Sequence, residues 1–202
     1  MGAVIIHGVI LAFGLILPLG VQNIFIFQQG AYHTHFVRAL PAVLTAALCD
    51  LLLITLAVGG VSMIVLANDM FKTILMAGGC LFLFYMGWVT WKTKNGKGNE
   101  EGEAFTGKKQ ILFAASVSLL NPHAILDTVG VIGTSSLQYS GTDRWLFALS
   151  CVTVSWIWFF GLAVSGRYFG KMDQTGKLMS FVNKCSALII WGVALMLLYS
   201  LL

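Results

Sequence analysis

The chain has 202 residues, of which 58% are hydrophobic and 10% are charged, and its net charge is +4. Soluble domains carry about 25% charged residues, so this chain lacks the polar side chains that would cover a soluble core. The composition therefore indicates an integral membrane protein. The four cysteines lie in apolar stretches without a CxxC pair. This favours buried small side chains over a disulfide framework, a metal site or a redox pair.

Six apolar runs follow one another along the chain, and each is long enough to be a transmembrane helix. A helix needs about 20 apolar residues to cross the hydrocarbon core, because each residue adds about 1.5 Å. Lipid offers no hydrogen bonds to irregular backbone, and the runs lack the alternation of barrel strands. We therefore predict an all-α polytopic membrane protein with six spans, near residues 3–28, 38–66, 70–91, 109–137, 144–166 and 182–202.

The polar breaks between the spans predict the orientation of the chain. The longest break, 92–108, has the composition of a flexible solvated loop. Ten Lys and Arg residues fall in or beside loops one, three and five, whereas two fall on the other side. The positive-inside rule then places the 92–108 loop in the cytoplasm and both termini outside. The net charge is a signal of topology and does not indicate nucleic-acid binding.

Two of the predicted spans are interrupted at matching places, by "LPLGVQN" in the first and "LLNPHAILD" in the fourth. The polar and helix-breaking residues in these segments are Pro18, Gly20, Gln22, Asn23, Asn121, Pro122, His123 and Asp127. Asn23 and Asn121 are 98 residues apart, while "AVGG" at 57–60 and "AVSG" at 163–166 are 106 apart, so the repeat is approximate. Because three spans per half is an odd number, the second half must enter the membrane from the opposite side.

The pattern predicts two inverted three-helix repeats, residues 1–91 and 109–202, joined by the 92–108 loop in one transmembrane domain. Secondary transporters of this architecture bind substrate near the bilayer midplane, where broken helices face a cavity. We expect helices 1 and 4 to be broken at Pro18 and Pro122, with Gly20 as a further hinge residue. The alternative is that both prolines are only kinks between packed helices.

Small residues spaced four apart occur twice. Ala42 and Ala46 are typical of close helix packing within a span. "GRYFG" at 166–170 fits the GxxxG pattern, but its place at a span end beside Arg167 favours a turn.

Two acids, Asp50 and Asp127, lie deep within predicted spans, and no Lys or Arg lies at similar depth. An acid at the centre of a membrane helix costs at least about 2.5 kcal/mol on insertion scales, so such residues are rare without a function. One interpretation is a protonated carboxyl that is hydrogen-bonded for structural reasons. The other is that both acids face a wet cavity, which would then be electronegative and attract cations.

Amide side chains accompany the two acids. Gln22, Asn23 and Asn121 supply donors for a carboxylate and acceptors for an ammonium group, which are the groups of a zwitterionic amino acid. His123 lies four residues before Asp127, so the two can share one helix face. A proton relay through His123 is one interpretation, and a histidine that only hydrogen-bonds the loosened backbone is the other.

The motifs "LPLGVQNIFIFQQG", "CDLLLI" and "NPHAILDTV" resemble, in this order, the lysine/arginine exporter family, the LysE and ArgO branch of the LysE superfamily. The resemblance covers nearly the whole chain, although Val21 replaces a residue that is often Pro or Ala in relatives. It implies a bacterial inner-membrane exporter of basic amino acids that is driven by the proton motive force, without a cofactor or metal. Carried over residue by residue, the substrate-binding positions are Gln22, Asn23, Asp50, Asn121 and Asp127.

We therefore predict a secondary transporter, not an enzyme, that exports arginine, lysine or both. The alternatives are an exporter of neutral amino acids or of a divalent cation within the same superfamily. In our hypothesis, Asp50 or Asp127 binds either the cationic side chain or a proton, never both at once, while the two halves rock about Pro18 and Pro122. The choice between arginine and lysine, the coupling ion, and whether the chain forms a homo-oligomer are left open by the sequence.

Overall fold

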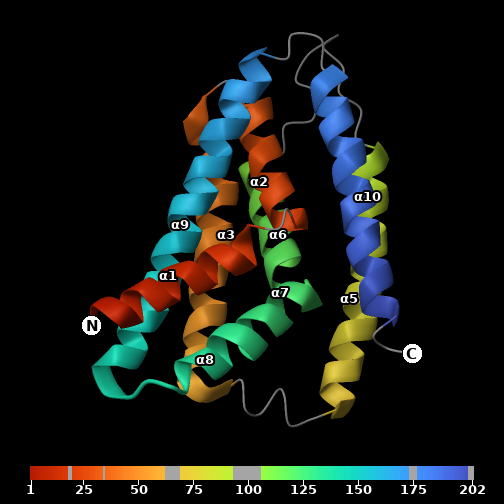
Figure 1. Ribbon diagram of the computed structural model, residues 1–202. Coiled ribbons are helices and arrows are strands. Elements are labelled where there is room, and N and C mark those ends of the chain that lie inside the picture. The colour runs from red at the N-terminus through yellow and green to blue at the C-terminus, as the bar shows by residue number, and fades with distance from the viewer. Residues whose placement is uncertain (18–19, 34, 62–68, 93–105, 173–176, 200–202) are drawn as a thin grey trace.

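The computed structural model describes residues 1–17, 20–33, 35–61, 69–92, 106–172 and 177–199. These residues form helices and short connections without a strand (Figure 1). The elements in the first half are α1 (Gly2–Ile16), α2 (Val21–Tyr32), η1 (Phe36–Ala39), α3 (Leu40–Leu56), η2 (Ala57–Val61) and α5 (Asp69–Lys92). Those in the second half are α6 (Gly107–Leu119), α7 (Pro122–Asp127), η3 (Thr128–Gly133), α8 (Thr134–Ser136), α9 (Gly141–Met172) and α10 (Lys177–Tyr199).

The described helices have the length and hydropathy of a polytopic membrane protein. Two continuous helical segments, Phe36–Gly60 and Gly141–Met172, are long and apolar enough to cross a membrane. Two bent pairs also pass this test if each is one span, which gives up to four spans by length and composition. The interpretation with six spans adds α5 and α10 and stays a prediction. Leu81, Leu149 and Met196 are among the many large apolar side chains exposed on the outer surface, as in a protein solvated by lipid.

The chain bends at both places where the sequence has polar interruptions. α1 and α2 meet at 80°, and Gly107–Leu119 meets Ala124–Ser136 at 57°. Gly20 is the N-cap residue of α2 in an extended conformation, whereas Pro18 lies outside the described residues. Pro122 is the first residue of α7, a position where the missing N–H costs no helix hydrogen bond. Whether the prolines themselves cause the bends stays a prediction.

A short π-helix occurs in each half of the chain. η2 extends the C-terminal end of α3 and contains Gly60, whose φ of 106° suits a glycine. η3 follows Asp127 directly at the end of α7. The two π-helices contact each other, so wider helical turns from both halves meet inside the molecule. Single π turns are frequent at functional sites.

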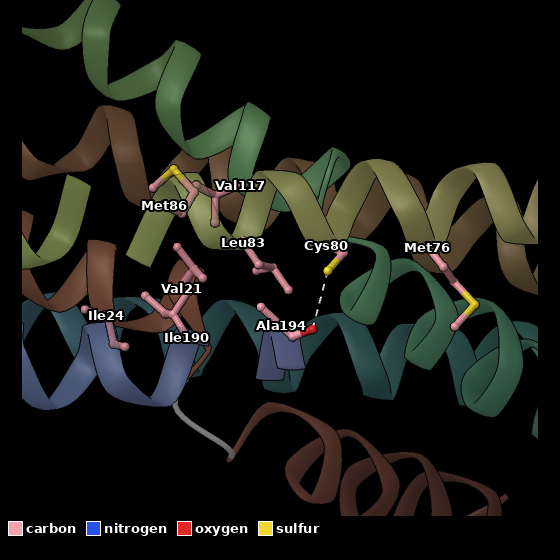
Figure 2. Close-up of a cluster of buried hydrophobic side chains, with 9 residues drawn as sticks. All are labelled: Val21, Ile24, Met76, Cys80, Leu83, Met86, Val117, Ile190 and Ala194. Carbon is pink, nitrogen blue, oxygen red and sulfur yellow. Dashed lines mark hydrogen bonds between the residues drawn. The ribbon is translucent and has the colours of Figure 1, made fainter. Parts of the chain in front are cut away.

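Four helix pairs make the most extensive contacts, and each joins the first half of the chain to the second. α2 packs on α9, α3 packs on α6, and α5 packs on α10, while α1 crosses α9. Figure 1 shows α5 and α10 side by side along one edge of the molecule. Figure 2 shows the apolar cluster that attaches this α5–α10 pair to α2 and α6. The cluster consists of Val21, Ile24, Met76, Cys80, Leu83, Met86, Val117, Ile190 and Ala194.

The backbones of α2 and α9 approach each other most closely. A Cβ atom added at Gly30 would collide with the Ala163 carbonyl, and one at Gly166 or Gly170 would collide with a carbonyl of α2. The expectation of a turn at 166–170 is therefore wrong, because α9 continues to Met172 and both glycines lie inside it. The glycines serve close packing within the chain, as small-xxx-small patterns do between membrane helices.

A buried glutamine links the start of α6 to the segment that runs from the end of α2 through η1 to the start of α3. The Gln110 Oε1 accepts a hydrogen bond from the Ala42 N–H at 3.2 Å, so the Gln110 NH₂ group must face the other way. That group donates to the Arg38 carbonyl at 2.9 Å and lies 2.8 Å from His33 Nε2. His33 Nε2 must then be the acceptor, which requires a neutral imidazole. Burial and the positive charge of Arg38 both lower the pKa of His33.

Replacing Gly166 by leucine should separate α2 from α9. Because the new side chain meets the backbone of Phe27, it cannot be accommodated by rotamer changes. The loss of folding stability should exceed the usual cost of overpacking, which is about 1–3 kcal/mol. We expect little monodisperse protein after detergent extraction, measured by fluorescence-detected gel filtration. Gly161→Leu on the same helix is the control, since a Cβ there meets nothing within 4 Å. Equal yields of the two variants would contradict the packing argument.

Acidification should destabilise the protein through His33. The unfolded chain takes up a proton near pH 6.5, whereas the folded chain takes it up only at a lower pH, so stability falls as the pH drops below about 6.5. Melting temperatures of the detergent-solubilised protein between pH 8 and 5 would measure this fall. His33→Asn should reduce the pH dependence, whereas His35→Asn, at an exposed position, should not. The same pH dependence in both variants would contradict the assignment.

Candidate functional site

A cavity of about 220 Å³ lies where the bent helices of the two halves meet α3, α5, α9 and α10. It is smaller than the roughly 300–1,000 Å³ typical of pockets for drug-sized ligands, so it suits a small solute. All five predicted substrate-binding residues line it, although they come from distant parts of the sequence. The lining residues are Ala12, Leu15, Ile16, Gly20, Val21, Gln22, Asn23, Asp50, Ile54, Leu83, Asn121, Ala124, Asp127, Thr128, Ile132, Cys151, Ser155, Phe159, Ile189 and Ile190.

Asp50 extends from the middle of α3, where regular helix on both sides fixes its backbone. Gln22 at the start of α2 donates a hydrogen bond from Nε2 to Asp50 Oδ1 at 3.3 Å. Ser155 of α9 is a further hydrogen-bonding partner of the same carboxyl group. Both partners are neutral, so they orient the carboxyl group without cancelling a negative charge on it.

Asn23 has a structural task that the sequence did not indicate. Its Nδ2 donates to the carbonyl of Ile16, the last residue of α1, at 2.7 Å. The last carbonyls of a helix have no partner within the helix, and here lipid could not supply one. The side chain of Asn23 is only 5% exposed and thus holds the α1–α2 bend from inside. Its amide nitrogen serves the backbone at least in part, and the substrate contact predicted for it stays a proposal.

Asn121 and Asp127 stand at the two ends of α7. Asn121 is buried immediately before the helix, and its carbonyl accepts the first α7 hydrogen bond, from Ile125 N–H at 3.1 Å. Asp127 is the last residue of α7, at the junction with the π-helix η3. Both residues line the same cavity as Gln22, Asn23 and Asp50. The short helix thus presents two polar side chains to the same space.

Three other predicted residues lie wholly or partly outside the described residues. The side chains of His123 and Pro122 lie outside what the structure describes, as does the whole of Pro18. Gly20, the remaining hinge residue, lines the cavity at the start of α2. A relay between His123 and Asp127 therefore stays a prediction.

Sequence reasoning missed Ser155, Cys151 and Thr128, which also line the cavity. Serine and threonine in membrane helices often bond only to their own backbone, so their presence in an apolar run gives little signal. The aliphatic and aromatic wall was missed for a similar reason, because Leu83 and Ile190 look like any other apolar residue in their spans. Thr128 could have been identified from its position, since it directly follows Asp127, which was predicted to bind substrate.

The cavity combines two carboxyl groups, amide side chains and apolar walls. No Lys, Arg or His is among the described residues that line it. Among the described residues, no three His, Cys, Asp or Glu side chains gather as a metal-binding group would. The chemistry of the cavity lining suits a small cation with polar ends and an aliphatic portion.

The comparisons with known proteins agree with one another in pointing to a family of transporters. The model of the family described as LysE type translocator matches residues 13–201. YisU of Bacillus subtilis (strain 168), which carries a provisional description as an amino-acid transporter, is 64% identical over 94% of this chain and 86% of its own length. The arginine exporter protein ArgO of Pectobacterium carotovorum (strain PC1) is 33% identical over 98% of this chain and 97% of its own. ArgO of Escherichia coli O157:H7 is 31% identical over 95% and 91%.

No solved structure matches the chain significantly. The family model, in contrast, covers nearly all of it, including both bends and every polar residue of the cavity. The relatives with the arginine exporter name match along almost their full length. This chain belongs to the LysE type translocator family.

Proposed function

We propose that the protein exports basic L-amino acids, arginine, lysine or both, from the bacterial cytoplasm across the inner membrane in exchange for protons. The observation that carries the proposal is the convergence of Asp50 and Asp127, one from each half, on a single cavity. Relatives named as arginine exporters match over nearly the whole chain, which supports the same substrate class.

The two acids suit a substrate with two positive groups and one negative group. One carboxylate binds the guanidinium or side-chain ammonium, with the strong, charge-assisted hydrogen bonds that such pairs make. The amides of Gln22 and Asn121, together with backbone groups at the breaks, bind the α-carboxylate and α-ammonium groups. The methylene groups of the substrate contact Leu83 and Ile190 on the α5–α10 side. His123 is the candidate for moving a proton to and from Asp127.

Proton exchange solves the energetic problem of exporting a cation. Moving one positive charge outward against an interior-negative potential costs about 2.3 kcal/mol per 100 mV. If a proton enters for each substrate that leaves, the net charge moved is zero and the pH gradient drives export. A carboxylate that holds either the substrate or a proton would enforce this exchange.

We further propose that residues 1–91 and 109–202 are inverted repeats, with the 92–108 loop in the cytoplasm and both termini outside. The helix pairing supports this interpretation. If a two-fold axis exchanges spans one and four, two and five, and three and six, then α1 is equivalent to α6 and α3 to α9. The α1–α9 contact then becomes the α6–α3 contact, and the α5–α10 contact maps onto itself. All three contacts occur in the fold, whereas the extensive α2–α9 contact has a much smaller counterpart between α3 and η3.

An efflux assay tests the substrate class. Cells that lack their own basic-amino-acid exporters are loaded with dipeptides containing arginine or lysine, with threonine as a third substrate. Expression of this protein should accelerate the loss of arginine, lysine or both, and leave threonine unchanged. A gain for threonine alone would support export of a neutral amino acid, and no gain for any of them would contradict the proposal.

Replacing both acids tests the mechanism. Asp50→Asn with Asp127→Asn should abolish the export of arginine and its dependence on pH, because no charged group would remain to bind substrate or proton. Asp143→Asn, in the first turn of α9 and away from the cavity lining, is the matched control. The measurement is uptake of labelled arginine into inside-out vesicles under an imposed pH gradient. Undiminished pH-dependent transport by the double variant would refute the mechanism.

A further inference from the structure

Ser155 stands out among the hydroxyl groups of α9. It is 3% exposed, lines the cavity, and hydrogen-bonds to the carboxyl group of Asp50. It lies one helical turn after Cys151, which also lines the cavity, so this face of α9 is turned toward the site. A serine on a buried, cavity-lining face is therefore in direct contact with one of the two acids.

The other hydroxyl side chains in the same part of α9 bond to their own helix. Ser150 donates to the Leu146 carbonyl at 2.8 Å, and Thr153 donates to the Leu149 carbonyl at 2.7 Å. These are the ordinary bonds of serine and threonine to the carbonyl four residues earlier. The corresponding contact of Ser155 is a long one, 3.4 Å to the Val152 carbonyl. Ser155 therefore makes only a weak bond to its own helix, and the carboxyl group of Asp50, on another helix, is its second partner.

The carboxyl group of Asp50 lies between donors from both halves of the chain. Gln22 reaches it from α2, and Ser155 reaches it from α9. A Lys or Arg partner would neutralise the acid and compete with a cationic substrate, whereas neutral donors hold the group and leave its charge available. Two neutral bonds also restrict the rotation of the side chain, so that the remaining lone pairs keep one direction.

We propose that Ser155 is a positioning residue that, together with Gln22, directs the Asp50 carboxyl group toward the substrate in the cavity. This inference rests on the proposed function for the role of Asp50, but the contact itself can be tested without substrate. Ser155→Ala removes the donor at almost constant volume, and Ser155→Thr keeps it. Ser150→Ala is the matched control, since Ser150 is buried on the same helix and bonds to its own backbone.

Infrared spectroscopy of the purified full chain tests the contact. At acidic pH the C=O stretching band of the protonated Asp50 carboxyl can be assigned by its loss in Asp50→Asn. Because a hydrogen bond to the C=O group lowers this frequency, Ser155→Ala should move the band upward. Ser155→Thr should restore it, and Ser150→Ala should leave it unchanged. An unmoved band in Ser155→Ala would overturn the proposal.

Transport of labelled arginine in vesicles tests the consequence. Ser155→Ala should lower kcat/KM about tenfold, as expected for the loss of one hydrogen bond to a charged group, mainly through a higher KM. Ser155→Thr should recover most of this loss. Equal losses in Ser155→Ala and Ser150→Ala, or no loss in either, would overturn the positioning role. If the unmodified protein transports no basic amino acid, the proposed function fails, while the infrared result still decides whether Ser155 holds Asp50.

Discussion

The fold depends on a helix end whose backbone carbonyl is hydrogen-bonded inside the protein. An interrupted helix in an apolar environment leaves carbonyl groups that lipid cannot hydrogen-bond, and each would cost several kcal/mol. The Asn23 side chain bonds the last carbonyl of α1, which allows α2 to leave at a steep angle. The bend in turn places Gln22 beside Asp50. The break is therefore stable only where polar side chains surround it, and this requirement creates a polar cavity.

The same requirement applies to the second half of the chain. There the break occurs at Asn121, and the short helix α7 places Asp127 on the cavity before the chain widens into a π-helix. An acid in a membrane helix is costly, and a second acid nearby adds repulsion whenever both are ionised. A cation or a proton between them relieves both costs. The proposed export of basic amino acids would bring positive charge into this cavity.

Much of this site could be predicted because its residues are unusual for their surroundings. Asp50 and Asn121 are conspicuous in apolar runs, and the structure brings them to one cavity. Ser155 could not be singled out, because its sequence context is that of a serine bonding to its own helix. The helical character of 166–170 was also missed, since a span ending at Arg167 and a helix that continues to Met172 have the same composition. Only the facing backbone of α2 explains why these glycines are needed.

The glycine contacts between α2 and α9 have a mechanical consequence. Because backbone touches backbone at Gly30 and Gly166, no layer of side chains lies between them that could repack. We expect the two helices to move as one body, and because they belong to different halves, the halves could not rock against each other as two separate rigid bodies. Opening of the cavity must then occur along surfaces that slide on aliphatic side chains, such as the one where Ile24 of α2 meets Leu83 and Ile190. In that case the α5–α10 pair would move to open the cavity, while the α2–α9 pair would stay fixed.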